Sequence, residues 1–520
     1  MASEARAKGG PAAKGLGEAA GRCAALVDLV VPASAIGLPS GGARIGTASV
    51  FSAEADLPET CRVNGAILPA TPGAPQITFQ INLPRAWNEK AVQFGGGGFN
   101  GFLVDGLRSL PGVVAGVADV PNPLARGFAT FGSDGGHLVA NPFDASFARN
   151  TEARENYMGA AVKRLHDAAV AVVGAYYGKA PRRLYYAGGS KGGHEALVAA
   201  QRYGADFDGA IAYYPAKDSV GLILGWGALT KAAYGPGGGA LSPVKQAFVH
   251  RAVLAACDGL DGLADGVIAN TAACEAAISP VSLACPAASA PAGDCLDPSE
   301  VAALAVASRR TVYPYPLANG VASIGPFPVL SEGSLDQTWL SAGGRAATLY
   351  EQLNNGIARN FWTNDAAAGL DRLDLAALRS VIEAHSRASD ATSTDLEAFR
   401  RHGGKLILVQ GTTDMLVPPA ATTDYYRRLA GRYGEAVEGL ARYFIQPGYG
   451  HGNGPFTLSW DSLGALDAWV ETGRFPAAPV ATDGNAATRG RQMPLCAYPL
   501  FARFTGGDPR AATSFRCAAR

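Results

Sequence analysis

The sequence predicts an α/β protein with a mostly parallel sheet, and three observations support this class. Between residues 151 and 215, helical patterns alternate with short apolar runs typical of strands, and the alternation returns between residues 405 and 473. Strands that alternate with helices usually form a parallel sheet covered on both faces. The composition agrees, because 48% of the 520 residues are hydrophobic and only 17% are charged, which is typical of globular chains with a large core.

The elements follow from local patterns along the chain. Residues 27 to 94 contain short runs such as QITFQINLP and KAVQFGG, which are rich in β-branched and aromatic residues and predict strands. Residues 151 to 178 predict a helix that ends at a glycine. RRLYYAGG predicts a strand, GGHEALVAAQRYG a helix and DGAIAYYP a further buried strand.

This rhythm is lost from residue 216 to 400, where four of the eight cysteines and several Gly/Pro-rich breaks occur. It resumes with a strand at KLILVQG, a helix over about 420 to 432, a strand at ARYFIQPG and a helix at SLGALDAWVETG. We therefore expect a catalytic domain in two parts, residues 1 to 215 and 401 to 520, with a second domain inserted at residues 216 to 400.

The charge pattern excludes some classes of partner. Lysine plus arginine and aspartate plus glutamate each number 44, and no basic block interrupts the chain, so neither nucleic acid nor an anionic membrane is expected to bind. No apolar run reaches the roughly 18 residues of a membrane span. We expect a monomer or weak oligomer that acts on a small molecule and needs no organic cofactor.

Eight cysteines fall into four couples that are local in sequence. They could pair in 105 ways, of which nearest-neighbour pairing is the simplest. Such pairing indicates an oxidising compartment, and the alternative is a cytosolic chain with eight reduced thiols. The first 22 residues lack the apolar core of a secretory signal, so an exported chain would have lost its signal already.

The stretch YAGGSKGG carries the spacing G-x-S-x-G, with Gly188, Ser190 and Gly192 between a predicted strand and a predicted helix. This context is typical of the nucleophile elbow of an α/β-hydrolase, in which a strained turn exposes the serine hydroxyl at the carboxyl edge of the sheet. The alternative is a tight structural turn in a glycine-rich chain.

A serine nucleophile needs a histidine base and an acid that orients it, in the chain order Ser, Asp or Glu, His. Asp414 follows the predicted strand LILVQG, and His451 follows the next one. Five of the seven histidines lie in helical patterns or before a strand. His137, in GSDGGHLV, is the remaining alternative to His451, and would otherwise be a structural loop histidine.

The negative charge that develops on the substrate oxygen needs two backbone donors. We expect one from Lys191, directly after the nucleophile, and one from the glycine-rich loop VQFGGGGFNG, with Gly97 and Gly98 as candidates. A phosphate cradle is the alternative for this loop. However, no G-K-S/T follows, so a P-loop is not supported.

The stretch CDGLDGLADGVIANTAAC brings Asp258, Asp261 and Asp265 within eight residues, with a cysteine at each end. Carboxylates separated by glycines, completed by backbone carbonyls such as those of Leu263 and Val267, are typical ligands of calcium. The spacing is not that of an EF-hand. We expect a structural Ca²⁺ site, and the alternative is an exposed Asp/Gly loop.

With these motifs, the chain resembles the tannase/feruloyl esterase family of α/β-hydrolases, which also contains bacterial mono(2-hydroxyethyl) terephthalate hydrolases. The resemblance runs nearly end to end. It rests on ETCRVNG, GGGGFNG, the serine turn, CDGLDGLADGVI, GTTDMLVPPAATTDYY, PGYGHGNGP and the tail LCAYPLFARFTGGDPRAATSFRC.

The resemblance implies an α/β-hydrolase fold with a large lid domain inserted after the half that bears the nucleophile. It also implies a catalytic triad of Ser190, Asp414 and His451. The calcium ligands it implies are Asp258, Asp261, Leu263, Asp265 and Val267. The disulfides it implies are Cys23–Cys61, Cys257–Cys274, Cys285–Cys295 and Cys496–Cys517.

One departure from the family pattern concerns two positions beside the triad. The family typically has a cysteine before the serine and another after the histidine, bonded to each other, where this chain has Gly189 and Gly452. We therefore expect the histidine loop to be held by packing alone and to be more mobile than in relatives.

The predicted activity is that of an exported serine carboxylic-ester hydrolase, and the resemblance favours esters of aromatic acids (feruloyl, galloyl or terephthaloyl type). Candidate substrate contacts in the insert are Trp226, Trp339, Arg359, Phe361 and Trp362. Two alternatives remain: a hydrolase of aliphatic hydroxyacid oligomers or amides with the same triad, and a non-catalytic binding protein on a hydrolase scaffold.

Overall fold

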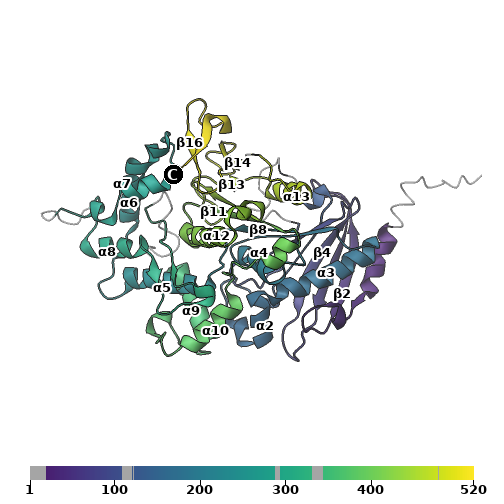
Figure 1. Ribbon diagram of the computed structural model, residues 1–520. Helices are drawn as coiled ribbons and strands as arrows, with labels where there is room; N and C mark the ends of the chain where they lie inside the picture. The colour runs from purple at the N-terminus through teal and green to yellow at the C-terminus, as the bar shows by residue number, and fades with distance from the viewer. Residues whose placement is uncertain are drawn as a thin grey trace, which may run out of the picture.

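Ten strands form one twisted sheet at the centre of the molecule (Figure 1). The structure, a computed structural model, describes residues 19–107, 120, 122–286, 293–330, 344–477 and 479–519. The strand order is β1-β2-β3-β4-β6-β5-β7-β8-β11-β12. The strands are β1 (Val30–Val31), β2 (Ala43–Phe51), β3 (Thr60–Ile67), β4 (Ile77–Pro84), β5 (Lys90–Phe94), β6 (Ala129–Ser133), β7 (Arg183–Gly189), β8 (Gly209–Tyr213), β11 (Lys405–Gly411) and β12 (Ala441–Gln446).

The sheet has an antiparallel half and a parallel half. Strands β1 to β4 pair antiparallel, as does β4 with β6, whereas β6, β5, β7, β8, β11 and β12 run parallel to one another. In the parallel half, all carboxyl ends lie at one edge of the sheet, where α/β proteins place their sites. The predicted α/β class is confirmed.

Helices cover both faces of the parallel strands, whose side chains alternate between two cores. Ala210 and Ala212 of β8 pack in the core under helices α3, α4 and α12, whereas Ile211 and Tyr213 pack in the core under α13. The described helices are α2 (Thr151–Glu155), α3 (Ala161–Tyr177), α4 (Lys191–Arg202), α5 (Ser219–Tyr234), α6 (Pro243–Cys257), α7 (Thr271–Ala277), α8 (Pro298–Ala307), α9 (Leu349–Ile357), α10 (Arg379–Ser389), α11 (Glu397–Arg401), α12 (Pro419–Tyr433) and α13 (Ser462–Thr472).

A long connection joins β8 to β11, which are neighbours in the sheet. It contains helices α5 to α11 and the short hairpin of β9 (Thr311–Val312) and β10 (Ser323–Ile324). Most of its buried side chains form a third apolar core, to which the sheet segments contribute residues such as Phe99, Tyr157 and Met415. Helices α5 to α10 gather on one side of the sheet (Figure 1). We call residues 216–400 the insert.

The C-terminal segment adds two small antiparallel sheets. They comprise β13 (Leu458–Ser459), β14 (Val480–Asp483) and β15 (Gln492–Pro494), and β16 (Phe501–Phe504) with β17 (Phe515–Ala518). The insert loop that follows α6 contacts β16, because a Cβ on Gly262 would lie 2.9 Å from the carbonyl oxygen of Phe504.

One predicted helix differs in the structure. The pattern of residues 151 to 178 predicts a single helix, but a π-helical turn at Asn156–Ala160 separates α2 from α3. Gly159 has a φ of 130° there, and a Cβ at this residue would lie 2.9 Å from Cγ1 of Val198. The helix is therefore offset where it packs against α4, while its predicted end at Gly178 is correct.

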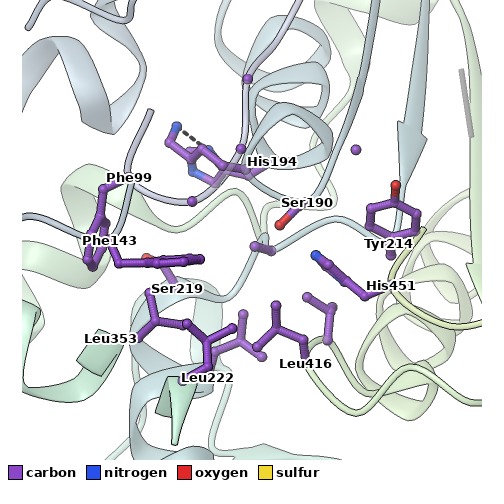
Figure 2. A pocket seen from close by; sticks show the side chains of 18 of the residues that line it. Phe99, Phe143, Ser190, His194, Tyr214, Ser219, Leu222, Leu353, Leu416 and His451 are labelled. Atoms are coloured by element: carbon purple, nitrogen blue, oxygen red, sulfur yellow. Dashed lines mark hydrogen bonds between the residues drawn. The ribbon is translucent and has the colours of Figure 1, made fainter. Parts of the chain in front are cut away.

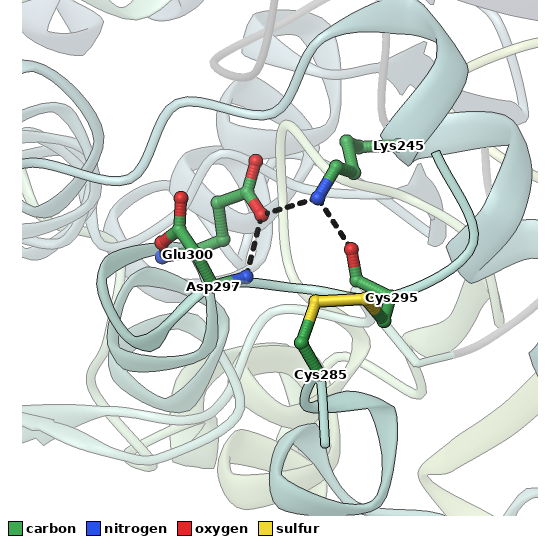
Figure 3. The surroundings of a disulfide bond; sticks show 5 residues. All are labelled: Lys245, Cys285, Cys295, Asp297 and Glu300. Carbon is green, nitrogen blue, oxygen red and sulfur yellow. Dashed lines mark hydrogen bonds and ion pairs between the residues drawn. A yellow bond between two sulfur atoms is a disulfide. The ribbon is translucent and has the colours of Figure 1, made fainter. Parts of the chain in front are cut away.

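All four predicted cysteine pairings are confirmed. The disulfides are Cys23–Cys61, Cys257–Cys274, Cys285–Cys295 and Cys496–Cys517. The third of them closes a loop of the insert (Figure 3). Next to it, Nζ of Lys245 donates hydrogen bonds to the carbonyl of Cys295 and to Glu300 Oε2. Glu300 also accepts the backbone N–H of Asp297 at the start of α8, so the disulfide loop is tied to two helices.

Within the described ranges, no helix is both long enough and apolar enough to cross a membrane.

Candidate active site

Ser190 lies in the turn between β7 and α4, with φ 58° and ψ −118°. A positive φ is unusual for a residue with a side chain and marks a strained turn. Close backbone contacts hold it: a Cβ on Gly188 would lie 2.5 Å from the carbonyl carbon of Gly192, and one on Gly193 would lie 2.5 Å from the carbonyl oxygen of Tyr213. Glycine is required at both positions because strand, helix and the chain after β8 meet there.

Asp414 and His451 follow β11 and β12, the next two strands at the same edge of the sheet. Asp414 is fully buried, and its Oδ1 accepts the backbone N–H groups of Leu416 and Val417, both at 2.9 Å. Its Oδ2 lies 2.9 Å from Nδ1 of His451 and also accepts a 3.2 Å hydrogen bond from Gln410 Nε2. The orientation of the carboxylate is therefore fixed by groups other than the imidazole.

Ser190 and His451 line one cavity of about 590 Å³. Figure 2 shows their side chains directed toward each other across it. With Nδ1 of His451 bonded to Asp414, the other ring nitrogen is the one available to the serine hydroxyl. The arrangement can accept a proton from Ser190 and stabilise the resulting imidazolium.

The predicted oxyanion donors line the same cavity. Gly97, Gly98 and Lys191 are all among its lining residues. Lys191 begins α4, and N–H groups in the first turn of a helix have no partner within that helix. The glycine loop is held against this helix by a 2.8 Å hydrogen bond from the N–H of Gly192 to the carbonyl of Gly96.

Glu195, which was not predicted from the sequence, connects this loop to the nucleophile helix. Its carboxylate is buried and accepts hydrogen bonds from Asn100 Nδ2 at 2.7 Å and from the N–H of Gly96 at 3.3 Å. It also accepts the Tyr186 hydroxyl at 3.0 Å and pairs with Lys191 Nζ at 3.1 Å. A carboxylate four residues after a lysine is common on helix surfaces, so no sequence signal marked this role.

His194 also lines the cavity, but its ring is held by other groups. Lys191 Nζ lies 3.0 Å from its Nδ1, and its Nε2 lies 2.6 Å from the carbonyl of Ser389. Burial, followed by the charge of Lys191, lowers the pKa of His194 well below its ordinary value. A neutral ring with Nε2–H donated to Ser389 satisfies both contacts, so His194 is not available as a base.

His137, the alternative to His451, is a buried loop histidine. Its Nε2 lies 2.9 Å from the carbonyl of Phe99, and its ring stacks on Phe147 with centroids 3.6 Å apart. Burial lowers its pKa to about 4. It is not among the residues that line the cavity of Ser190.

Apolar side chains from the sheet loops and from the insert form the rest of the cavity wall. Helix α9 contributes Leu349, Leu353 and Ile357, which recur every four residues on one face. The other large apolar or aromatic lining residues are Phe99, Phe102, Phe143, Tyr157, Tyr214, Leu222, Ile223, Trp226, Leu416 and Val417. Of these, only Trp226 was predicted from the sequence, and its Nε1 donates to the carbonyl of Leu416 at 2.9 Å.

The other predicted substrate contacts lie elsewhere. Phe361 stacks on His385 with centroids 4.8 Å apart, and Trp362 donates its Nε1–H to Nδ1 of the same histidine at 2.9 Å. Both pack in the insert core, because an apolar residue on a helix can equally face a core or a cavity. Arg359 donates to the carbonyl of Ala368 at 2.9 Å and lines a separate cavity. Trp339 lies outside the described residues.

The predicted calcium loop is closed by the Cys257–Cys274 disulfide and follows α6. Asp258 Oδ1 accepts the N–H groups of Asp265 and Gly266, and Asp261 accepts those of Leu263 and Ala269. Burial, with the neighbouring charges of Asp265 and Asp258, raises the pKa of Asp261 to about 6. Among the described residues, no three His, Cys, Asp or Glu side chains are grouped in an arrangement that holds a metal ion.

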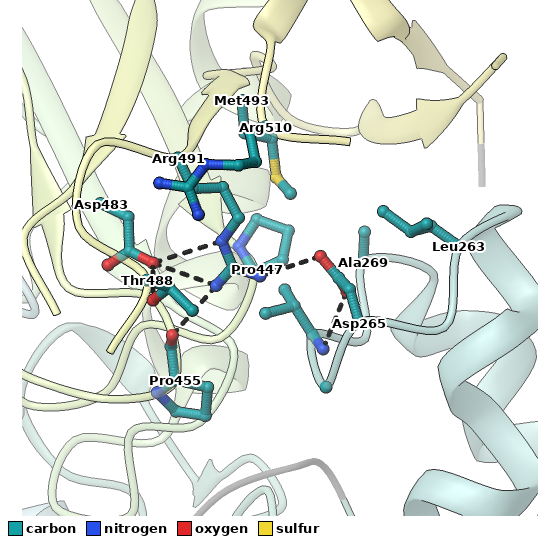
Figure 4. Close-up of polar contacts among 12 residues, drawn as sticks. Leu263, Asp265, Ala269, Pro447, Pro455, Asp483, Thr488, Arg491, Met493 and Arg510 are labelled. Atoms are coloured by element: carbon teal, nitrogen blue, oxygen red, sulfur yellow. Dashed lines mark hydrogen bonds and ion pairs between the residues drawn. The ribbon is translucent and has the colours of Figure 1, made fainter. Parts of the chain in front are cut away.

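The same loop lies next to the histidine loop. A Cβ on Gly448 would lie 3.2 Å from both methyl groups of Val267, so the two loops are in contact. Arg491 joins them from the C-terminal segment (Figure 4). Its guanidinium pairs with Asp265 at 2.9 Å and with Asp483 at 3.1 Å, and it donates to the carbonyl of Pro455 at 3.0 Å. The insert loop therefore supports the segment after His451.

Comparisons with known proteins match nearly the whole chain. The sequence model of the family described as "Tannase and feruloyl esterase" matches residues 61–518. An uncharacterized esterase of Agrobacterium fabrum is 37% identical over 96% of this chain and 93% of its own length. A mono(2-hydroxyethyl) terephthalate hydrolase of Piscinibacter sakaiensis is 33% identical over 91% of this chain and 87% of its own.

Solved structures show the same fold. Feruloyl esterase B from Aspergillus oryzae superposes with a TM-score of 0.76 at 21% identity, covering 96% of this chain and all of that one. Tannin acyl hydrolase from Aspergillus niger gives a TM-score of 0.68 at 20% identity, covering 96% of this chain and 95% of that one.

Proposed function

Because the chain belongs to the tannase and feruloyl esterase family and is a carboxylic ester hydrolase, we propose that Ser190, His451 and Asp414 are its catalytic triad. The observation that carries this proposal is the 2.9 Å contact between Asp414 Oδ2 and Nδ1 of His451, in a cavity that also contains the strained Ser190 turn. These three groups have the roles and the chain order of the α/β-hydrolase triad.

In the proposed mechanism, the Ser190 hydroxyl attacks the ester carbonyl while Nε2 of His451 takes its proton. Asp414 keeps the proton on Nδ1 and stabilises the imidazolium. The backbone N–H groups of Lys191 and of Gly97 or Gly98 hold the oxyanion. His451 then protonates the leaving alcohol, and a water molecule, activated by the same histidine, releases the acid from the acyl-enzyme.

We further propose that the substrate is an ester of an aromatic acid and that the insert acts as a lid. A cavity of about 590 Å³ suits a ligand of one or two rings, and the rings of Phe99, Phe143 and Trp226 line it together with helices α5 and α9. The names of two relatives, a terephthalate ester hydrolase and a feruloyl esterase, agree with this class.

A panel of methyl esters tests the substrate class. We expect kcat/KM for methyl benzoate to exceed that for methyl cyclohexanecarboxylate, a ring of similar size that is not planar, by about tenfold, the effect of roughly 1.4 kcal/mol. The ranking of methyl ferulate, methyl gallate and mono(2-hydroxyethyl) terephthalate then identifies the acyl group. Faster turnover of 3-hydroxybutyrate oligomers or of p-nitroanilides would instead favour the aliphatic or amide alternative.

We also propose that the loop at residues 257–274 binds a structural Ca²⁺ through Asp258, Asp261, Asp265 and the carbonyls of Leu263 and Val267. The oxygen donor set supports this proposal. A second support is that the negative charges of Asp258 and Asp265 repel that of Asp261, and a cation would relieve this repulsion. The carboxylates now accept backbone N–H groups, so the side chains have to turn for a cation to bind. Catalysis requires no step at this loop.

Chelation tests the calcium proposal. Calcium at 100 times its Kd stabilises the fold by about 2.7 kcal/mol, so EGTA should lower the Tm of the wild type and added CaCl2 should restore it. Asp261→Asn should remove this response, whereas Asp294→Asn, at an exposed aspartate of the insert, should keep it. An equal Tm in EGTA and CaCl2, without heat of binding in calorimetry, would show that Arg491 and the backbone hold the loop unaided.

The four disulfides support the further proposal that this chain acts in an oxidising compartment, either secreted or periplasmic.

A further inference from the structure

The turn around Ser190 contains one glycine that faces a side chain. Gly188, Gly192 and Gly193 each lie against backbone atoms, where a Cβ would collide. Gly189, in contrast, lies against the ring of Tyr214: a Cβ there would be 2.8 Å from Cε2 and from the hydroxyl oxygen, and 2.9 Å from Cζ. The absence of a side chain at residue 189 therefore makes room for this ring.

The same ring contacts His451. The centroids of Tyr214 and His451 are 4.4 Å apart, with planes inclined by 48°. Figure 2 shows the tyrosine next to the imidazole, with its hydroxyl directed away from it. The ring thus lies between the nucleophile turn and the histidine, and it touches both.

The backbone around Tyr214 fixes the ring relative to Ser190. The N–H of Ser190 donates to the carbonyl of Tyr213, and the N–H of Ala216 donates to the carbonyl of Ser190, both at 3.0 Å. The N–H of Tyr214 donates to the carbonyl of Val409 at 2.7 Å. Tyr214 itself has a φ of 32°, a left-handed conformation that a tyrosine adopts only where its surroundings impose it.

His451 needs a second restraint. Among the described residues its side chain makes one hydrogen bond, to Asp414, and 23% of the side chain is exposed. A single bond at Nδ1 fixes one atom of the ring but allows the imidazole plane to turn about it. The inclined ring of Tyr214, packed against the imidazole, limits this rotation and so keeps Nε2 directed at Ser190.

We propose that Tyr214 is a positioning residue, whose ring holds the His451 imidazole toward Ser190 and occupies the space left by Gly189. This inference rests on the proposed function, in which His451 is the base. The role is one of contact and not of proton transfer. Burial raises the pKa of Tyr214 above its ordinary value, so the phenol stays neutral wherever the enzyme works.

A double-mutant cycle tests the proposal with p-nitrophenyl acetate, whose acyl group is too small to depend on the cavity wall. Gly189→Ala and Tyr214→Ala should each lower kcat by about 10- to 100-fold with little change in KM, because a displacement of about 1 Å costs this much. The double variant should be no slower than Tyr214→Ala alone, because the new methyl group then has no ring to displace. Tyr214→Phe, which keeps the ring, should retain kcat within about threefold.

Two matched controls separate this effect from general destabilisation. Gly174→Ala adds a methyl group to α3, where no atom lies within 4 Å of the new Cβ. Tyr443→Ala removes a buried ring from β12 that packs on Tyr426 and Tyr498, away from the cavity. Both should leave kcat unchanged at a temperature where circular dichroism shows the fold intact.

Three outcomes would overturn the role of Tyr214. The first is that the losses of the two single variants multiply in the double variant. The second is that Tyr214→Ala raises KM alone, and the third is that Tyr214→Phe is as slow as Tyr214→Ala. No turnover by the wild type would instead refute the proposed function itself.

Discussion

Ser190→Ala should abolish ester hydrolysis while leaving the fold and substrate binding in place. In serine hydrolases of this design, loss of the nucleophile lowers kcat by about a millionfold, because no other group can form the acyl-enzyme. KM should change little, since the hydroxyl forms its bond to the substrate only as the reaction proceeds. The measurement is single-turnover and steady-state release of p-nitrophenol, with near-UV circular dichroism to confirm folding.

Covalent labelling adds an independent readout of the same prediction. Phenylmethanesulfonyl fluoride should sulfonylate the wild type once, at Ser190, with release of fluoride, and should not label the variant. Ser308→Ala is a suitable control, because within the described part of the chain that hydroxyl donates to the carbonyl of Leu304 at the end of α8 and lies outside the cavity. A Ser190→Ala protein that keeps more than a few per cent of the activity would show that another group attacks the ester.

The sequence was sufficient to select the three residues of the proposed triad because each of them is marked by local signals. The serine is flanked by glycines between a strand and a helix, and the acid and the histidine each follow an apolar strand. The rule that parallel strands end at one edge of the sheet is then enough to bring the three together. Residues 183–189, 405–411 and 441–446 are strands as predicted. The disulfides were equally accessible, because every pair joins cysteines that are neighbours in sequence.

The cavity wall could not be predicted in the same way. Leu349 and Leu353 have the spacing of an apolar helix face. Buried helix residues that line no cavity have the same spacing. Which element such a face meets is decided by the packing of the insert on the sheet loops, over separations of a hundred residues or more. For this reason the sequence did not distinguish Trp226, which lines the cavity, from Phe361 and Trp362, which pack in the insert core. The stacking of Trp226 on Tyr350 also left no trace in the pattern.

Glu195 and Tyr214 were missed for a related reason. Each acts on a loop that is distant in sequence: Glu195 accepts the N–H of Gly96, and Tyr214 packs on His451. For Tyr214, the only trace in the sequence is Gly189, the residue against which its ring packs. The sequence alone does not reveal that a ring lies against this glycine. Contacts of this kind become visible once the strand order is known.

Asp414→Asn should reduce kcat by about 10⁴-fold, although the substitution changes the side chain by a single heavy atom. Leu416 and Val417 donate their N–H groups to Oδ1, so the amide oxygen of the asparagine should occupy this place. Its NH2 group then takes the place of Oδ2 and faces Nδ1 of His451 and Nε2 of Gln410. To accept from this NH2 group, His451 must carry its proton on Nε2, where it can no longer take the proton of Ser190.

A second buried aspartate provides the matched control for this argument. Asp134 also has no exposed surface, and it accepts the backbone N–H groups of Thr78 and Gly136, but it contacts no histidine in the described structure. Asp134→Asn should therefore share any loss of Tm with Asp414→Asn but keep kcat within about tenfold of the wild type. If both variants lost activity equally, the effect would be structural. If Asp414→Asn kept most of its kcat, His451 would not need the tautomer that Asp414 imposes, and the proposed triad would reduce to a Ser190–His451 pair.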